Sequence, residues 1–144
     1  VAVITPIRDI CKGKEAITNI LDLYRELLHF GWSKETCINS LQSRWSERNP
    51  CIGQSGITAL LIQNCFGGEI YYFRTSNWNH YFNKISGEII DLTCHEVDSN
   101  CVDRYETASR VGESEQSQKR FYKSNEVAYK QLIKNCKIKI KRKG

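Results

Sequence analysis

The sequence predicts a single domain of the α+β class, and two patterns in its 144 residues carry this prediction. Apolar residues recur at helical spacing over residues 14–29 and again over residues 55–66. Strand-like stretches rich in aromatic and β-branched residues then follow one another without a helical pattern between them: 69–74, 80–85 and 88–92. Helices followed by consecutive strands are typical of helices packed on a small antiparallel sheet.

The helices are defined by their ends. Gly31 follows the 14–29 segment as a C-terminal cap would, and Ser33 is predicted to cap a shorter helix that ends near Leu41. The 55–66 segment is apolar on nearly every side and stops at Gly67-Gly68, which predicts a buried helix.

The remaining segments are less regular. Residues 45–53 contain Pro50 and Gly53, which disfavour a helix. Ser86-Gly87 joins the last two strands and predicts a hairpin. Residues 94–119 are polar and predict a long loop or weakly ordered insertion, and Ser124 is predicted to cap a last helix that ends near Asn135.

The composition is that of an ordinary globular protein, with 40% hydrophobic and 26% charged residues. No stretch approaches the roughly 20 apolar residues that a membrane span needs. The apolar run at the N-terminus is too short for a signal peptide, and the chain contains no methionine. We therefore expect residues 1–144 to be one domain excised from a longer protein, acting in the cytoplasm or delivered into a target cytoplasm.

The formal net charge of +5 is concentrated at the C-terminus, because residues 134–144 hold six basic and no acidic side chains. Such a tail can attract nucleic acid or an anionic membrane surface. Its alternation of Lys and Ile favours the other interpretation, an edge strand or frayed terminus kept soluble by lysine. A nucleic-acid partner is therefore the less favoured hypothesis.

The seven cysteines form no Cys-x-x-Cys pair, and the three histidines form no zinc-type pair, so we expect no metal and no cofactor. The odd number argues against a complete disulfide framework and favours a reducing compartment. Cys37 and Cys65 lie within apolar helical patterns and are expected to be small buried hydrophobic residues.

Three residues have the spacing of a catalytic site. Ser55 is predicted to begin a helix, where the dipole and free N–H groups favour a thiolate or a developing oxyanion. His80 and Asp91 lie on neighbouring predicted strands, and a carboxylate in the apolar stretch 89–92 needs a partner such as His80. A nucleophile, a base and an orienting carboxylate are the parts of a hydrolase triad.

Across about residues 41–94 the chain resembles the bacterial YunG-like proteins and, more distantly, the papain-like and transglutaminase-like hydrolases. The resemblance rests on these short motifs: Asn49-Pro50, Gly53-Gln54, Thr58-Ala59-Leu60, Gly67-Gly68-Glu69-Ile70, His80-Tyr81-Phe82-Asn83 and Ile90-Asp91-Leu92-Thr93. It implies a papain-like fold, in which the nucleophile-bearing helix packs on a small antiparallel sheet with further helices beside it. In those relatives a cysteine follows Gly-Gln, so Ser55 is a departure, either introduced to trap an inactive protein or natural.

The resemblance implies a thiol amide hydrolase or acyl transferase, acting as a peptidase, deamidase or isopeptidase on a protein or peptide. His80 would serve as the base, Asp91 would orient it, and the backbone N–H of residue 55 would stabilise the oxyanion. The Gln54 side chain is a further candidate donor to the oxyanion, with a simple Gly-Gln turn as the alternative. Trp45, Trp78 and Tyr81 are the candidate walls of the cleft, with ordinary core positions as the alternative for each. With serine at position 55 we expect binding of substrate and almost no turnover.

Other interpretations stay open. Ser55 alone could be only a helix cap, and the whole domain a natural pseudoenzyme or protein-binding module, or an excised toxin or effector domain. Cys51 could be the nucleophile in place of Ser55, without help from the helix dipole. Cys94 and His95 are adjacent and would point to opposite faces of a strand, and His29 is most simply exposed near a helix end.

Overall fold

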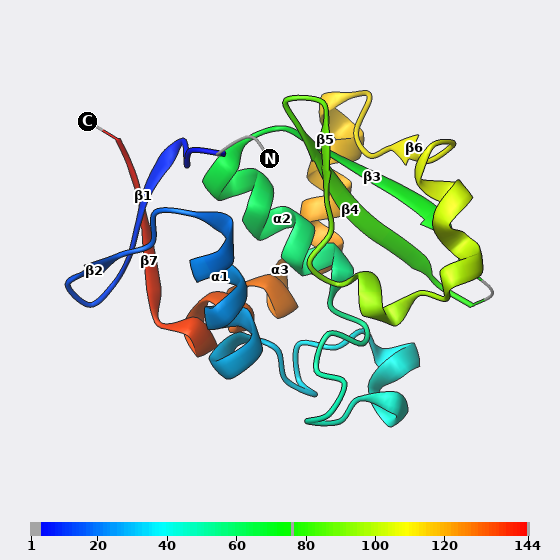
Figure 1. Cartoon of the computed structure of the whole chain (residues 1–144), viewed down its shortest axis with the longest axis horizontal. Helices are drawn as coiled ribbons and strands as arrows, with labels where there is room; N and C mark the ends of the chain where they lie inside the picture. The colour runs from blue at the N-terminus through cyan, green and yellow to red at the C-terminus, as the bar shows by residue number, and fades with distance from the viewer. Residues whose placement is uncertain (1–3, 76, 144) are drawn as a thin grey trace.

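The computed structural model describes residues 4–75 and 77–143, and it confirms a mixed α+β fold with two antiparallel sheets (Figure 1). One sheet has the order β5-β4-β3-β6, formed by Glu88–Ile90, Asn79–Ile85, Glu69–Arg74 and Ser109–Arg110. The other has the order β2-β1-β7, formed by Glu15–Ala16, Arg8–Lys12 and Ile138–Arg142. The two long helices are α2, Ser55–Phe66, and α3, Glu115–Cys136.

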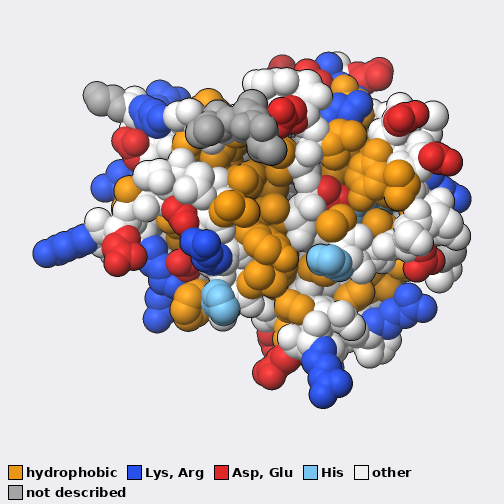
Figure 2. Space-filling view, viewed as in Figure 1, with side chains coloured by type: hydrophobic (Ala, Val, Ile, Leu, Met, Phe, Trp, Pro, Cys, Tyr) orange, Lys and Arg blue, Asp and Glu red, His pale blue; other side chains and the backbone are white. Residues whose placement is uncertain are grey.

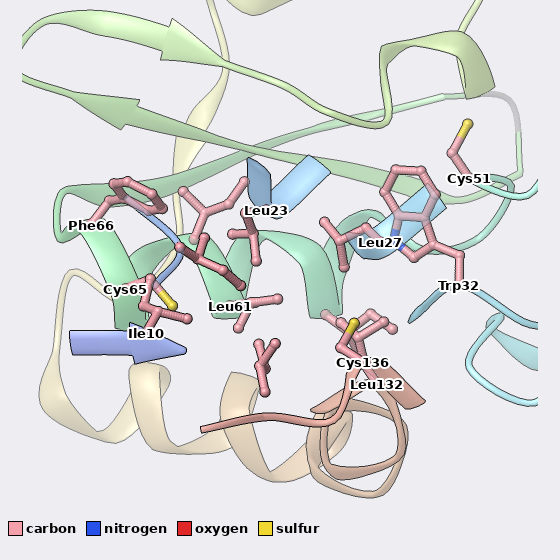
Figure 3. Close-up of a cluster of buried hydrophobic side chains, with 14 of the residues drawn as sticks. Ile10, Leu23, Leu27, Trp32, Cys51, Leu61, Cys65, Phe66, Leu132 and Cys136 are labelled. Carbon is pink, nitrogen blue, oxygen red and sulfur yellow. The ribbon is translucent and has the colours of Figure 1, made fainter. Parts of the chain in front are cut away.

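Helix α2 begins and ends at the residues that the sequence predicts, and it contacts both sheets and α3. Its surroundings explain why it is apolar on nearly every side: Leu23 of helix α1, Ile20–Glu26, and Leu27 of the π-helical turn η1, Leu27–Gly31, join its side chains in one core cluster. Figure 3 shows the resulting core, in which α2 side chains meet those of the other elements: Ile10, Leu23, Leu27, Trp32, Leu61, Cys65, Phe66, Leu132 and Cys136. Cys65 and Cys37 are buried, as predicted.

The β4-β5 hairpin is confirmed, and its turn has a simple cause. Ser86 and Gly87 both have positive φ, 51° and 80°, which is the backbone conformation of the two-residue turns that match the twist of paired strands. The third predicted strand is shorter than expected, since β5 ends at Ile90. Asp91 therefore follows the strand instead of lying within it.

The sheet presents two different faces, and this arrangement positions the candidate site. Tyr81 and Asn83 face the helices: the Asn83 Nδ2 group donates to the Ala59 carbonyl of α2 at 2.9 Å, and Tyr81 packs on Phe121 of α3. Side chains alternate along a strand, so His80 lies on the opposite face, where its ring packs against Phe73.

The N-terminal prediction is wrong over its first part. The 14–29 segment does not begin as a helix, because Glu15–Ala16 pairs with β1 and α1 starts only at Ile20. Asn19 caps this helix by accepting a hydrogen bond from the Asp22 backbone N–H at 2.9 Å. The buried Ile17 fits the helical spacing equally well from an extended position, so the periodicity extended the predicted helix too far.

Three other predictions need correction. The helix expected from Ser33 to Leu41 is absent, and a 3-10 helix, η2, lies at Asn39–Arg44 instead. The expected loop at 94–119 contains the 3-10 turns η3, Cys94–Glu96, and η4, Ser99–Tyr105, and also β6. The last helix begins at Glu115, capped by Ser114 and not by Ser124. The 94–110 segment gains its structure from contacts with β3 and β4, which local propensity does not report.

The C-terminal tail is an edge strand, as its alternating pattern predicts. Strand β7 pairs antiparallel with β1 across five residues and leaves Lys139 and Lys141 exposed at the edge. Lysines at an edge discourage pairing with a further strand.

Candidate functional site

Ser55 is the first residue of α2, and its side chain is buried beside β4. Its Oγ accepts a hydrogen bond from the Tyr81 backbone N–H at 3.1 Å. This N–H is free for Ser55 because β5 pairs with β4 only from Asn83 to Ile85. The serine thus joins the start of α2 to the stretch of β4 that β5 leaves unpaired.

His80 is fully buried, and each ring nitrogen meets a carboxylate. Its Nε2 lies 2.6 Å from Asp91 Oδ2, which is the predicted pairing. Its Nδ1 lies 2.7 Å from Glu96 Oε1. The expected hydrogen bond between His80 and Ser55 is therefore absent: Glu96 occupies the nitrogen that Ser55 would need, and α2 packs on the other face of the sheet.

Two carboxylates around one imidazole set its charge. Burial by itself lowers the pKa of His80, but the hydrogen bonds and charges of Asp91 and Glu96 outweigh burial and raise this pKa to about 9. At neutral pH His80 is an imidazolium whose two protons point at the carboxylates. An imidazolium held in this way cannot accept a proton, so it is not a general base in this conformation.

The two carboxylates make further hydrogen bonds that fix the surrounding chain. Asp91 accepts from the Tyr105 hydroxyl at 2.5 Å and from the backbone N–H of Thr93 at 3.1 Å. The second oxygen of Glu96 accepts from the Gly53 backbone N–H at 2.9 Å. The charged cluster therefore holds the loop that leads into Ser55.

Glu96 and Tyr105 were missed by sequence reasoning, because both lie in the segment predicted to be a loop. The sequence signal was weak, because nothing in a polar segment distinguishes an acidic residue that becomes a buried partner from one that stays exposed. Their contact with His80 and Asp91 depends on how η3 and η4 fold over the sheet.

The Gln54 side chain does not point to an oxyanion site. It is fully buried, its Oε1 accepts from Thr36 Oγ1 at 2.6 Å, and its Nε2 donates to the Ser33 carbonyl at 2.9 Å. With its oxygen and its nitrogen both engaged, Gln54 ties the 33–36 turn to the start of α2. It gives α2 no side-chain cap.

A hollow of about 300 Å³ opens beside Ser55, and it contains two of the three predicted cleft residues, Trp78 and Tyr81. The indole N–H of Trp78 is buried and is without a hydrogen-bond partner among residues 4–75 and 77–143. Trp45 does not line this hollow; its indole donates to the Pro50 carbonyl at 3.0 Å.

Of the rival nucleophiles, Cys51 is poorly placed for reaction. Cys51 is buried, and burial together with the nearby Glu96 carboxylate raises the pKa of its thiol to about 12. Cys94 and His95 are exposed on a 3-10 turn and not on a strand, so strand alternation does not separate them. His29 is exposed, as expected, and all seven cysteines are free.

Within the described ranges, no helix combines the length and the apolar character that crossing a bilayer requires. Residues 19–141 match the family described as YunG protein. The chain is also 31% identical, over 106 residues, to the protein named Uncharacterized protein YunG of Bacillus subtilis (strain 168). The aligned region covers 74% of this chain and 82% of that protein. No solved structure matches the chain. The family match spans most of the chain, including α2, the β4-β5 hairpin and the His80 cluster, and the chain belongs to the YunG family.

Proposed function

We propose that this domain binds an extended peptide segment of another protein across the start of α2, and that the form with Ser55 does not hydrolyse it. The observation that carries the proposal is the state of His80: both ring nitrogens are held by carboxylates, so Ser55 has no base beside it. A serine hydroxyl needs an adjacent base to become a nucleophile.

The binding part of the proposal rests on the shape around Ser55. A second hollow, of about 410 Å³, adjoins the one of about 300 Å³, since five residues line both: Ile38, Gly53, Gly56, Ser124 and Asn125. Together they form a groove between α3 and the 33–44 segment. Gly56 keeps the groove open, because a Cβ at this position would lie 3.0 Å from Asn125 Oδ1.

Selection from a displayed library of random dodecapeptides, followed by NMR titration with the strongest peptide, tests this proposal. Bound peptide should shift the amide signals of Gly53, Gly56 and Tyr81. Gly56→Ala should weaken binding about tenfold by narrowing the groove. Gln63→Ala, on the same helix but outside the groove, should leave the affinity unchanged. Shifts confined to other surfaces, or cleavage of the peptide by the serine form, would refute the proposal.

A second candidate is the thiol hydrolase that a cysteine at position 55 would create, acting by peptide cleavage, deamidation or acyl transfer. Two observations favour it: residue 55 begins a helix of 12 residues that lacks a side-chain cap, and His80 is paired with Asp91. The uncapped N–H groups at a helix start favour a thiolate. This candidate requires His80 to leave Glu96 and the stretch of β4 around it to rearrange, because the ring now lies on the face of the sheet opposite α2.

Ser55→Cys tests the hydrolase candidate directly. If position 55 activates a thiol, the new cysteine should react with iodoacetamide at pH 7 faster than Cys94, an exposed native thiol, as measured by peptide mass spectrometry. Adding Glu96→Gln should raise the rate further by releasing one nitrogen of His80. A slower reaction than Cys94 in both variants would exclude an activated thiol here.

The seven free cysteines also bear on where the domain acts. We propose that it acts in a reducing compartment such as the cytoplasm, its own or that of a target cell, because four of the thiols are buried without disulfide partners.

A further inference from the structure

A separate hollow of about 570 Å³ lies on the face of the sheet opposite α2, beneath η3 and η4. We call it the acidic hollow. Ile89, Val97 and Val102 form its apolar walls, and Asp91, Asp98 and Glu106 supply carboxylates. Figure 2 shows hydrophobic side chains gathered on the side of the molecule where β5 and these turns lie, with acidic side chains close to them.

The apolar walls are unusually open to solvent for their residue types. Ile89 is 46% exposed and Val102 is 65% exposed, and they belong to different elements that meet at this hollow. An exposed apolar pocket that also contains a few polar groups is the usual form of a binding site.

The charge of the acidic hollow is opposite to that of the molecule. The chain has a net charge of +5, yet no lysine or arginine is among the described residues that line the hollow. The basic residue of η4, Arg104, donates to the Arg74 carbonyl. Lys84 pairs with Ile89, and its Nζ lies over the Tyr71 ring.

The buried cluster beside the hollow adds to its negative charge. Asp91 shares the His80 imidazolium with Glu96, so one positive charge faces two carboxylates. Asp98 and Glu106 are exposed at the rim with no ion pair among the described residues. A pocket with apolar walls and an excess of carboxylates is complementary to an aliphatic chain that ends in a cation.

We propose that the acidic hollow binds the side chain of a lysine presented by a partner protein. The four-carbon stem would lie against Ile89, Val97 and Val102, and the ammonium group would reach Asp98 and Glu106. Lysine fits better than arginine because Asp98 and Glu106 flank opposite ends of η4 and are not paired in one plane. An ammonium donates in three directions, whereas a guanidinium needs planar, paired acceptors.

NMR titration of the whole chain with Nα-acetyl-lysine methylamide tests the proposal, with the norleucine and arginine analogues as comparisons. The lysine compound should bind with a dissociation constant in the millimolar range, about 1 mM, and shift the amides of Ile89 and of residues 97–106. The uncharged norleucine analogue should bind about tenfold more weakly, and added salt should weaken the lysine compound.

Two sets of variants complete the test. Asp98→Asn with Glu106→Gln should lower the affinity about tenfold, whereas Asp103→Asn, which removes a carboxylate from the same turn outside the hollow, should not. These side chains are exposed, so the fold should persist, as the remaining amide spectrum would verify. Equal binding of norleucine, tighter binding of arginine, or full affinity in the double variant would each overturn the proposal. Gly56→Ala should leave lysine binding intact, which separates this site from the groove beside Ser55.

Discussion

At the scale of single residues, the His80 cluster shows how a sequence motif can acquire a different role in the fold. His80 and Asp91 meet as their spacing predicts, but Glu96 completes a three-residue ion cluster that holds the histidine as a cation. Breaking one member of a buried charge cluster leaves another charge without compensation, which typically costs about 3–5 kcal/mol. We therefore expect His80 to stabilise the fold in the serine form.

The raised pKa of His80 predicts a pH dependence of stability. The pKa is about 9 in the folded protein and about 6.5 in an unfolded chain, so the stabilisation is complete below pH 6.5 and is lost as the pH rises toward 9. The unfolding free energy should fall by roughly 1.4 kcal/mol per pH unit between pH 7 and 8.5. Urea denaturation across this range measures it.

The control for this prediction is His29→Gln, which removes an exposed histidine and should leave the slope unchanged. Buried thiols such as Cys51 contribute in the same direction, but only above about pH 8.5, where unfolded cysteines ionise. A flat stability profile between pH 7 and 8.5 would contradict a charged His80.

Glu96→Gln is a second prediction at the residue level. Glutamine can still accept from the Gly53 N–H, but it removes one of the two charges that hold the His80 proton. The pKa of His80 should fall toward its ordinary value, as followed by the NMR signal of the ring Cε1 proton. Glu106→Gln removes an exposed carboxylate and should not move it. An unchanged pKa in the Glu96 variant would mean that Asp91 alone holds the proton.

At the scale of elements, α3 shows why a helix start is hard to place. The sequence predicts Ser124 as the cap, but the structure uses Ser114. The Ser114 Oγ accepts from the Ser117 backbone N–H at 3.1 Å, and the Ser117 Oγ accepts in turn from the Ser114 backbone N–H. Ser124 lies inside the helix and donates to the Phe121 carbonyl. The first turns of α3 are polar, so hydrophobic periodicity does not report them.

The pair Ser114 and Ser124 therefore forms a matched test. Ser114→Ala should lower the unfolding free energy by about 1 kcal/mol, because it leaves N–H groups at the helix start without a partner. Ser124→Ala should be neutral or slightly stabilising, because alanine is the better helix former inside a helix. Thermal and urea denaturation of both variants measures the difference. Equal losses would mean that the capping bond contributes nothing.

At the scale of the whole molecule, α2 lies between two sheets that join distant parts of the chain. Strand β1, near the N-terminus, pairs with β7, near the C-terminus, through contacts such as Ile10 opposite Ile140. The lysine-rich tail is therefore part of the fold. Any electrostatic attraction of these lysines to polyanions would act from a folded edge strand and not from a loose tail.

Two neighbouring positions on β7 test this structural role. Ile138 is buried in the core, and Ile138→Ala should cost about 2–5 kcal/mol of unfolding free energy. Lys139 points to solvent from the same strand, and Lys139→Ala should change stability by no more than about 0.5 kcal/mol. Urea denaturation distinguishes the two. A small loss for Ile138 would mean that β7 is not docked in solution.

The sequence by itself determined the elements whose signals are local. Helix α2 follows from continuous apolar spacing between Ser55 and Gly67, and the β4-β5 hairpin follows from a two-residue turn that tolerates positive φ. It also determined the pairing of His80 with Asp91, because the hairpin folds the segment after β5 back alongside the start of β4. These features depend only on residues close in the chain.

Tertiary structure decided that His80 and Ser55 lie on opposite faces of β4. It also decided which side chain binds the second ring nitrogen of His80. Glu96 reaches that nitrogen from a 3-10 turn, and Gln54 is taken by Thr36, although neither contact has a periodic signal. The start of α3 and the strand β1 were likewise set by packing against distant partners. Local propensity is weak in such polar or short segments, so the free energy of burial and of ion pairing selects their structure.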